Sequence, residues 1–171
     1  QQWDIQLPEY EVESVTFPYE GQVVDWGVSY LKSADFWSKS RGQQAIVFIL
    51  DTGVETNHPD LKDRVIIEYC KDFTGSANGY QDAHGHGTHC AGITAASDNA
   101  IGVVGNAPQA GIGVAKVLND QGSGSFQTVA LGIRWVSDLT LTGQHAGKKK
   151  VISMSLGGGG GAPELESAIN Y

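Results

Sequence analysis

Cysteine is scarce in this sequence, with two residues among 171. Two cysteines can form at most one bridge, so the fold is not a disulfide scaffold, and we expect Cys70 and Cys90 to be unpaired. The chain also lacks an apolar run approaching the roughly 18 residues of a membrane span, so no membrane partner is expected. No signal peptide is visible at the polar start of the chain, although a mature secreted protein has already lost its signal.

Positive charge is also scarce. The chain carries 11 lysines and arginines against 19 aspartates and glutamates, which gives a net charge of −8. This balance argues against nucleic acid as the main partner and is compatible with a soluble secreted protein or with one that binds cations. Residues 1–21 have five carboxylates and no lysine or arginine. We expect them to form an N-terminal arm or extension beside a domain over residues 22–171.

Buried strands and helices alternate along this domain. The run "AIVFIL" (residues 45–50) is continuously apolar and rich in β-branched residues, which is typical of a strand buried on both faces of a parallel sheet. Further strands are expected at residues 64–69, 111–118 and 151–155, and helices at 28–41, 87–97 and 163–171. A flexible turn is expected at 119–125, followed by a helix with the apolar stripe Val129, Ile133 and Val136. The pattern predicts an α/β fold with an open, mainly parallel twisted sheet and helices on both faces. Function then gathers beyond the carboxyl ends of the strands, where Asp51 and the glycine runs 122–124 and 157–161 lie.

The segment "DAHGHGTHCAG" (residues 82–92) crowds three histidines, a carboxylate and a thiol together. One interpretation is a zinc site made by His84, His86 and His89 with Asp82. The chain has no HExxH motif, however, and the intervening glycines disfavour one rigid helix that carries the ligands. A second interpretation is an aspartic protease, because "ILDTGV" resembles the motif of that class. The residue after Asp-Thr-Gly is valine, not the serine or threonine of that motif.

A third interpretation is a Ser-His-Asp relay. A neutral imidazole that takes a proton from a hydroxyl must be held in one tautomer, and a buried carboxylate at a strand end can hold it. Asp51 follows a strand and His86 precedes a helix, so the two side chains could meet across one layer of the sheet.

Three long segments, in the same order, resemble those of the subtilisin-like serine proteases, the subtilases. "VFILDTGVETNHPDL" resembles the family's aspartate motif, "HGHGTHCAG" its histidine motif, and "VISMSLGG" the strand and loop that line its substrate cleft. The similarity runs from about residue 22 to residue 171 and covers the N-terminal part of the peptidase domain. The resemblance implies a subtilisin-like fold, incomplete in this chain, and a secreted serine endopeptidase.

The resemblance also assigns roles to single residues. Asp51 would orient the base, and His86 would act as general base and then as general acid. His89 matches a structural histidine, and Cys90 matches a small buried position. A protein or peptide substrate would bind extended between two segments of the cleft. The residues implied for substrate binding are Gly122, Ser123, Gly124 and Phe126 on one side, and Ser155, Leu156 and Gly157 on the other.

A calcium ion is the cofactor that the resemblance implies. The ligands would be the side chains of Gln22, Asp60 and Asn99 and the carbonyl oxygens of Ser97, Ile101 and Val103. Ligation by oxygen alone suits Ca²⁺.

The nucleophile of the family has no counterpart in these 171 residues. Neither the Gly-Thr-Ser-Met-Ala segment nor the Ala-Gly-Asn turn that carries the oxyanion asparagine is present. We expect the C-terminal part of the same enzyme to supply both, as a second chain or as a segment absent from this one. Residues 1–171 alone are then inactive and expose a strand edge and an apolar helix face at Leu165, Ala168 and Ile169.

Two other functions are compatible with the same motifs. The chain could be a non-catalytic pseudoprotease fragment that binds peptides or a partner chain, or a structural domain that binds a cation. The presence of both Asp51 and His86 favours the enzyme, because a pure binding module needs neither.

Overall fold

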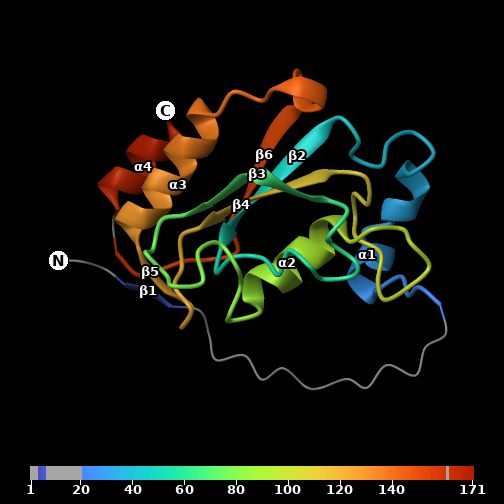
Figure 1. The fold of residues 1–171 in the computed structure, drawn as a ribbon, viewed down its shortest axis with the longest axis horizontal. Coiled ribbons are helices and arrows are strands. Elements are labelled where there is room, and N and C mark those ends of the chain that lie inside the picture. The colour runs from blue at the N-terminus through green and yellow to red at the C-terminus, as the bar shows by residue number, and fades with distance from the viewer. Residues whose placement is uncertain (1–3, 7–20, 161) are drawn as a thin grey trace.

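The computed structural model describes residues 4–6, 21–160 and 162–171, so most of the expected arm lies outside the described residues. The sequence folds into an α/β structure with a parallel sheet between layers of helices, as the alternation of strands and helices predicts (Figure 1). The elements in chain order are β1 (Asp4–Gln6), α1 (Trp26–Tyr30), η1 (Ser33–Phe36), β2 (Ala45–Asp51), β3 (Val65–Asp72), α2 (His86–Ala95), β4 (Gly111–Lys116), β5 (Ser123–Ser125), α3 (Phe126–Asp138), η2 (Gly143–His145), β6 (Lys149–Ser153) and α4 (Pro163–Ile169).

The main sheet has the order β3-β4-β2-β6, and each pairing in it is parallel. Strand β2 lies inside this sheet, and all of its residues after Ala45 are buried, as expected for a continuous apolar run. Asp51 ends β2 and pairs with Lys116 at the end of β4. The carboxyl ends of the two strands therefore place charged groups at one edge of the sheet.

The side chains of β2 alternate between two cores, because successive residues of a strand point to opposite faces. Phe48 belongs to the core beneath α3, together with the predicted helical stripe Val129, Ile133 and Val136. Ile49 belongs to the core beneath α2. Figure 1 shows α2 on one face of the sheet and α3 with α4 on the other. Burying one such side chain contributes about 1.5–3 kcal/mol, so both faces hold β2 in place.

Three local expectations are corrected. The helix expected from residue 28 ends at Tyr30, because Lys32 is left-handed with φ 55° and only the short η1 follows. The last residues of the turn expected at 119–125 form β5, which pairs with β1. The apolar face of α4 is largely covered, since α4 packs against α3. Ala168 is 1% exposed and Leu165 partly buried, whereas Ile169 remains exposed.

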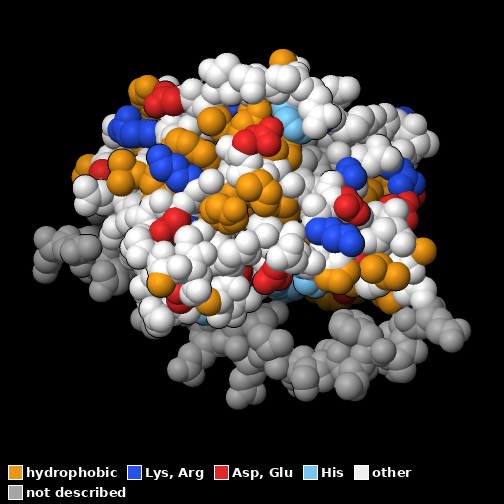
Figure 2. Space-filling view, viewed as in Figure 1, with side chains coloured by type: hydrophobic (Ala, Val, Ile, Leu, Met, Phe, Trp, Pro, Cys, Tyr) orange, Lys and Arg blue, Asp and Glu red, His pale blue; other side chains and the backbone are white. Residues whose placement is uncertain are grey.

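Other features of the described part agree with the sequence. Strand β6 lies at an edge of the sheet, so this edge is unpaired among the residues described. Both thiols are free. Within the described ranges, no helix combines the length and the hydrophobicity that crossing a membrane requires. On the face shown in Figure 2, lysines and arginines lie in small separate groups between acidic and hydrophobic side chains.

Candidate active site

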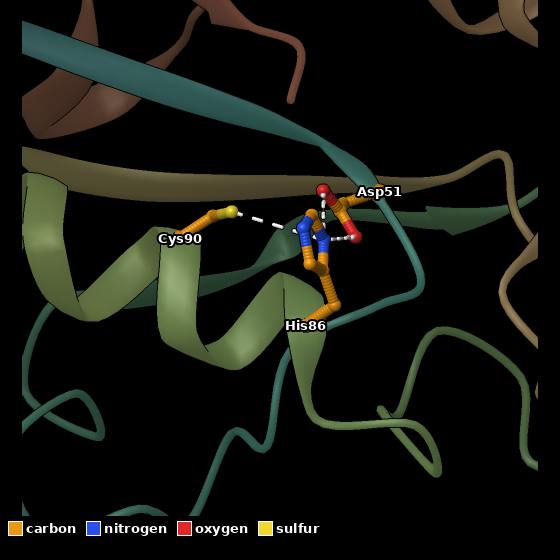
Figure 3. A group of neighbouring side chains, drawn as sticks. All are labelled: Asp51, His86 and Cys90. Carbon is orange, nitrogen blue, oxygen red and sulfur yellow. Dashed lines mark hydrogen bonds and ion pairs between the residues drawn. The ribbon is translucent and has the colours of Figure 1, made fainter. Parts of the chain in front are cut away.

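Asp51 and His86 meet where β2 ends and α2 begins. The two carboxylate oxygens of Asp51 lie 2.8 and 3.0 Å from Nδ1 of His86 (Figure 3). Asp51 is 1% exposed, and its Oδ1 also accepts a hydrogen bond of 2.7 Å from the backbone of Thr52. A buried carboxylate keeps the proton of a neutral imidazole on Nδ1, which leaves Nε2 as the basic nitrogen.

Glycine allows this close approach of helix and strand. A Cβ on Gly87 would lie 2.1 Å from the carbonyl oxygen of Gly53 and 3.2 Å from the Cβ of Asp51. Gly85, just before α2, has φ 102°, a conformation that side chains disfavour. The two glycines that flank His86 therefore have separate roles. Gly85 turns the chain into the helix, and Gly87 lets the helix contact β2.

Asp82 stabilises the start of α2 through hydrogen bonds. Its Oδ1 accepts from the backbone of His84 and Gly85 and from the Thr52 hydroxyl, at 3.0, 2.9 and 2.9 Å. Its Oδ2 accepts from the Thr88 backbone and hydroxyl at 2.9 and 2.6 Å. Burial opposes the charge on Asp82, but the hydrogen bonds from Thr88, Gly85 and His84 outweigh it and lower the pKa of this carboxyl.

The histidines do not form the zinc site that the crowded segment suggested. Among the described residues, the cluster of three metal-capable side chains is Asp51, His86 and Cys90, and it includes neither Asp82 nor the other histidines. The rings of His84 and His86 are 6.4 Å apart, and His89 is on the exposed side of α2.

Lys116 is a site residue that the sequence did not predict. It is completely buried, and its ammonium group donates to the carbonyl oxygens of Thr52 and Gln81. It also pairs at 2.8 Å with Asp120, and the hydrogen bonds from Lys116, Ser76 and Asn78 together lower the pKa of Asp120 to about 2. The signal for Lys116 was a charged residue inside an otherwise apolar strand. Its contacts hold the chain just after Asp51.

The first predicted substrate segment accepts an extended strand in this structure. Ser123–Ser125 form β5, and β1 pairs with it antiparallel, with Ile5 opposite Gly124. Gly122 has φ 72°, and a Cβ there would lie 2.8 Å from Nε2 of His84. The backbone of this segment therefore offers hydrogen bonds to an extended chain, and residues 4–6 of the protein itself now make them.

The second predicted substrate segment lies partly beside the first. Phe126, Leu156 and Gly157 line one open pocket between α3, α4 and the loop after β6. Ser155 is exposed, and its side chain interacts with the thiol of Cys90. The structure thus places Ser155 beside Cys90, and the other three residues together around the pocket.

The sequence did not predict the position of His84, and it predicted only a small buried position for Cys90. His84 lies against Gly122, and its Nδ1 is buried without a hydrogen-bond partner among the described residues. Sγ of Cys90 is 3.8 Å from Nδ1 of His86. Burial raises the pKa of the Cys90 thiol, and the negative charge of Asp51 adds to the rise.

Three of the oxygens implied for calcium lie around the side-chain amide of Gln22. Nε2 of Gln22 lies 2.6 Å from Ser97 O, 3.2 Å from Val103 O and 3.3 Å from Oδ1 of Asn99. The nearby carboxylate of Asp60 is 5% exposed and accepts hydrogen bonds from Asn99 and Val103. Ile101 contacts Asn99 through its backbone nitrogen, which donates at 3.2 Å, whereas the expected calcium ligand was its carbonyl oxygen.

This donor set fits a calcium ion. Three oxygens surround one atom of the Gln22 amide, and the oxygen and nitrogen of an amide exchange places by a rotation of the side chain. With its oxygen turned inward, Gln22 would complete a cradle of oxygens beside one carboxylate, which is the coordination that Ca²⁺ prefers.

Comparison with known proteins gives one family. Residues 42–171 match the model of the "Subtilase family". Thermitase of Thermoactinomyces vulgaris is 42% identical over 147 residues, which are 85% of this chain and 49% of thermitase. The intracellular serine protease of Paenibacillus polymyxa is 41% identical over 145 residues, which are 84% of this chain and 42% of the relative.

A solved structure agrees with these relatives. Sphericase is 38% identical, with a TM-score of 0.74 that covers 88% of this chain and 49% of sphericase. The chain spans about half the length of each of these relatives. The match of sequence, fold and family model shows that this chain belongs to the subtilase family.

Proposed function

We propose that this chain supplies the acid and the base of a serine endopeptidase, and that a further polypeptide segment supplies the serine and the oxyanion asparagine. The observation that carries the proposal is the pair of contacts, 2.8 and 3.0 Å long, between the buried Asp51 carboxylate and Nδ1 of His86. A binding module has no use for this pair, whereas acyl transfer to a serine requires it.

In the proposed reaction, Nε2 of His86 takes the proton of the serine hydroxyl as the oxygen attacks the peptide carbonyl. Asp51 keeps the other ring proton on Nδ1 and stabilises the imidazolium that forms. His86 then gives the proton to the leaving amine, and the peptide bond breaks to leave an acyl-enzyme. Water repeats the cycle and restores the serine.

The substrate would be a protein or peptide in extended form. The pairing of β1 with β5 supports this, because it is the pattern that an added substrate strand makes with an exposed edge. Gly122, Ser123 and Gly124 would bind its backbone on one side, and Ser155, Leu156 and Gly157 on the other. Phe126 would border a pocket for a side chain, and residues 4–6 must leave β5 before a substrate takes their place.

Calcium would stabilise the fold and take no part in the reaction. Gln22, Asp60 and Asn99 would hold it through their side chains, and Ser97, Ile101 and Val103 through their carbonyl oxygens. The ion would tie the segment before α1 to the loop after α2, which Val23 and Val103 already bridge.

The proposed enzyme is secreted, and it acts without nucleic acid or membrane partners. One relative is named as an intracellular serine protease. The cellular compartment of this protein therefore needs a test separate from that of the reaction. A fractionation that recovers the protein only inside the cell would contradict secretion and leave the proposed reaction untouched.

Hydrolysis of casein by the complete protein tests the proposal. We expect turnover that a serine-directed fluorophosphonate abolishes, and a fall of about 10⁴-fold or more in His86→Ala. Residues 1–171 alone should cleave nothing. The mass of the native protein under denaturing conditions tells whether the serine lies on a second chain. Turnover that resists the fluorophosphonate would contradict the proposed reaction, and binding of peptides without turnover would favour the pseudoprotease.

A further inference from the structure

The thiol beside the acid and the base has no part in the proposed reaction. Cys90 follows His86 by one helical turn, and its Sγ lies 3.8 Å from Nδ1 of His86. The ligand atoms of Asp51, His86 and Cys90 all lie within 4.8 Å of one another (Figure 3). A carboxylate oxygen, an imidazole nitrogen and a sulfur thus face one point from two elements, the end of β2 and the first turns of α2.

These spacings are close to those that a tetrahedral zinc ion imposes on its ligands. Zinc binds nitrogen and oxygen at about 2.0–2.2 Å and sulfur at about 2.3 Å, so neighbouring ligand atoms are roughly 3.3–3.7 Å apart. The separations from His86 Nδ1 are 2.8 Å to Asp51 Oδ1 and 3.8 Å to Cys90 Sγ. To meet the requirement, the first pair would have to open by at least about 0.5 Å and the second to close by at least about 0.1 Å.

The combination of donors also selects the kind of cation. A thiolate with an imidazole favours zinc and softer ions, whereas calcium and magnesium prefer oxygen alone. The cluster therefore differs in kind from the oxygen cradle at Gln22 and Asp60. We propose that Asp51, His86 and Cys90 form an inhibitory site for Zn²⁺, in which the cation replaces the proton between Asp51 and His86.

The protons balance in this exchange. Cys90 loses its thiol proton to solvent and binds as thiolate. The proton of a neutral His86 leaves Nδ1, which binds the cation, and a proton from solvent occupies Nε2, so the ring stays neutral. A water molecule fills the fourth position of the tetrahedron. The burial that keeps the thiol protonated is a cost that the bond between metal and sulfur has to exceed.

Inhibition follows from the tautomer. A ring that is bound to metal at Nδ1 and protonated at Nε2 has no lone pair left to accept the proton of a serine hydroxyl. Asp51 is then a metal ligand and no longer orients the base. Binding of the cation is a property of this chain alone, whereas the loss of turnover rests on the proposed function.

A titration of the complete protein with Cd²⁺ or Co²⁺ tests the site, with saturating CaCl₂ and no added thiol. Bonds between these ions and a thiolate give charge-transfer absorption, and Zn²⁺ should remove it by competition. We expect one equivalent of signal in the unaltered protein and in Cys70→Ser, because Cys70 is a partly buried thiol in β3, whose pKa burial raises to about 12. Cys90→Ser and Cys90→Ala should give none. Thermal melting without metal identifies a variant that has not folded, and protection of Cys90 from alkylation by Zn²⁺ then tests the site in the unaltered protein.

Turnover provides the second readout. Zn²⁺ should inhibit the unaltered enzyme, and Cys90→Ser should need at least the roughly 10–100-fold higher concentration that loss of a supporting group costs a metal site. Each variant is compared with its own rate without metal. Absence of the absorption, equal loss of it in Cys70→Ser, or equal inhibition in Cys90→Ser would overturn the site. Binding without any protease activity would uphold the site and contradict the proposed function.

Discussion

The carboxylate of Asp51 and Nδ1 of His86 lie 2.8 Å apart although 35 positions separate them in the sequence. Strand β2 delivers the carboxylate to the edge of the sheet, and α2 begins with the imidazole. The contact depends on how closely the helix approaches the strand, and Gly87 sets that distance.

Gly87→Ala should separate the acid from the base. The new Cβ would lie 2.1 Å from a backbone oxygen of Gly53, so α2 must move. We expect kcat to fall about 10²-fold, which is the loss that a misplacement of about 1 Å can cause, and the thermal midpoint to fall as well.

Gly92→Ala is the matched control, because a Cβ at this position of the same helix meets nothing within 4 Å. Its stability should stay equal or rise by up to about 1 kcal/mol, as for alanine in place of glycine in a helix. Equal kinetic effects of the two substitutions would contradict the role given to Gly87.

Asp82→Asn should destabilise the start of α2, because an amide cannot accept all five hydrogen bonds that the carboxylate now accepts. We expect a loss of about 2–3 kcal/mol in the free energy of unfolding at pH 7, measured by urea titration. The pKa of Asp82 is lowered in the folded protein, so its contribution is present above the ordinary value of 3.8. The difference between the two proteins should shrink as the pH falls below that value. A difference that grew as the pH fell would contradict the stabilising role given to Asp82.

Calcium should raise the thermal midpoint, and Asp60→Asn should remove most of the rise. A bound ion at 100 times its Kd adds about 2.7 kcal/mol to the free energy of unfolding. Asp98→Asn is the control, since Asp98 lies between Ser97 and Asn99 in the loop after α2 but pairs with Arg41 at the surface. An equal response of the two variants to CaCl₂ and to a chelator would show that Asp60 does not hold the ion.

Gly122→Ala should weaken the binding of extended peptides. The substitution strains a residue at φ 72° and brings a Cβ within 2.8 Å of His84 Nε2. Left-handed backbone costs a residue with a side chain about 1–2 kcal/mol, so we expect kcat/KM to fall about tenfold. Adding His84→Ala removes the clash and should recover part of the loss. No recovery in the double variant would mean that the ring of His84 does not border the segment.

The sequence predicted the parts of this structure that depend on local pattern. The continuous apolar run before Asp51 is typical of a strand buried on both faces of a parallel sheet, and the motif around His86 predicts the start of a helix. The carboxyl end of a strand and the start of a following helix meet in this kind of fold. The sequence therefore allowed the prediction that Asp51 and His86 lie close together.

The remaining features depend on contacts between distant segments. The left-handed turn at Lys32 and the pairing of β5 with β1 have no periodic signal. The packing of Ala168 beneath α3 depends on how α4 folds back. Lys116 and Asp82 are polar residues whose partners come from other loops, and a single sequence does not reveal which carbonyl or hydroxyl lies opposite them.

The most direct test of the account is a double-mutant cycle on Asp51 and His86 in the complete enzyme, with kcat measured for Asp51→Asn, His86→Ala and both together. We predict that each single change lowers kcat about 10⁴-fold or more and that the double variant loses little beyond the larger single loss, because the two groups act as one unit. Losses that multiply in the double variant, or a single loss below tenfold, would contradict it.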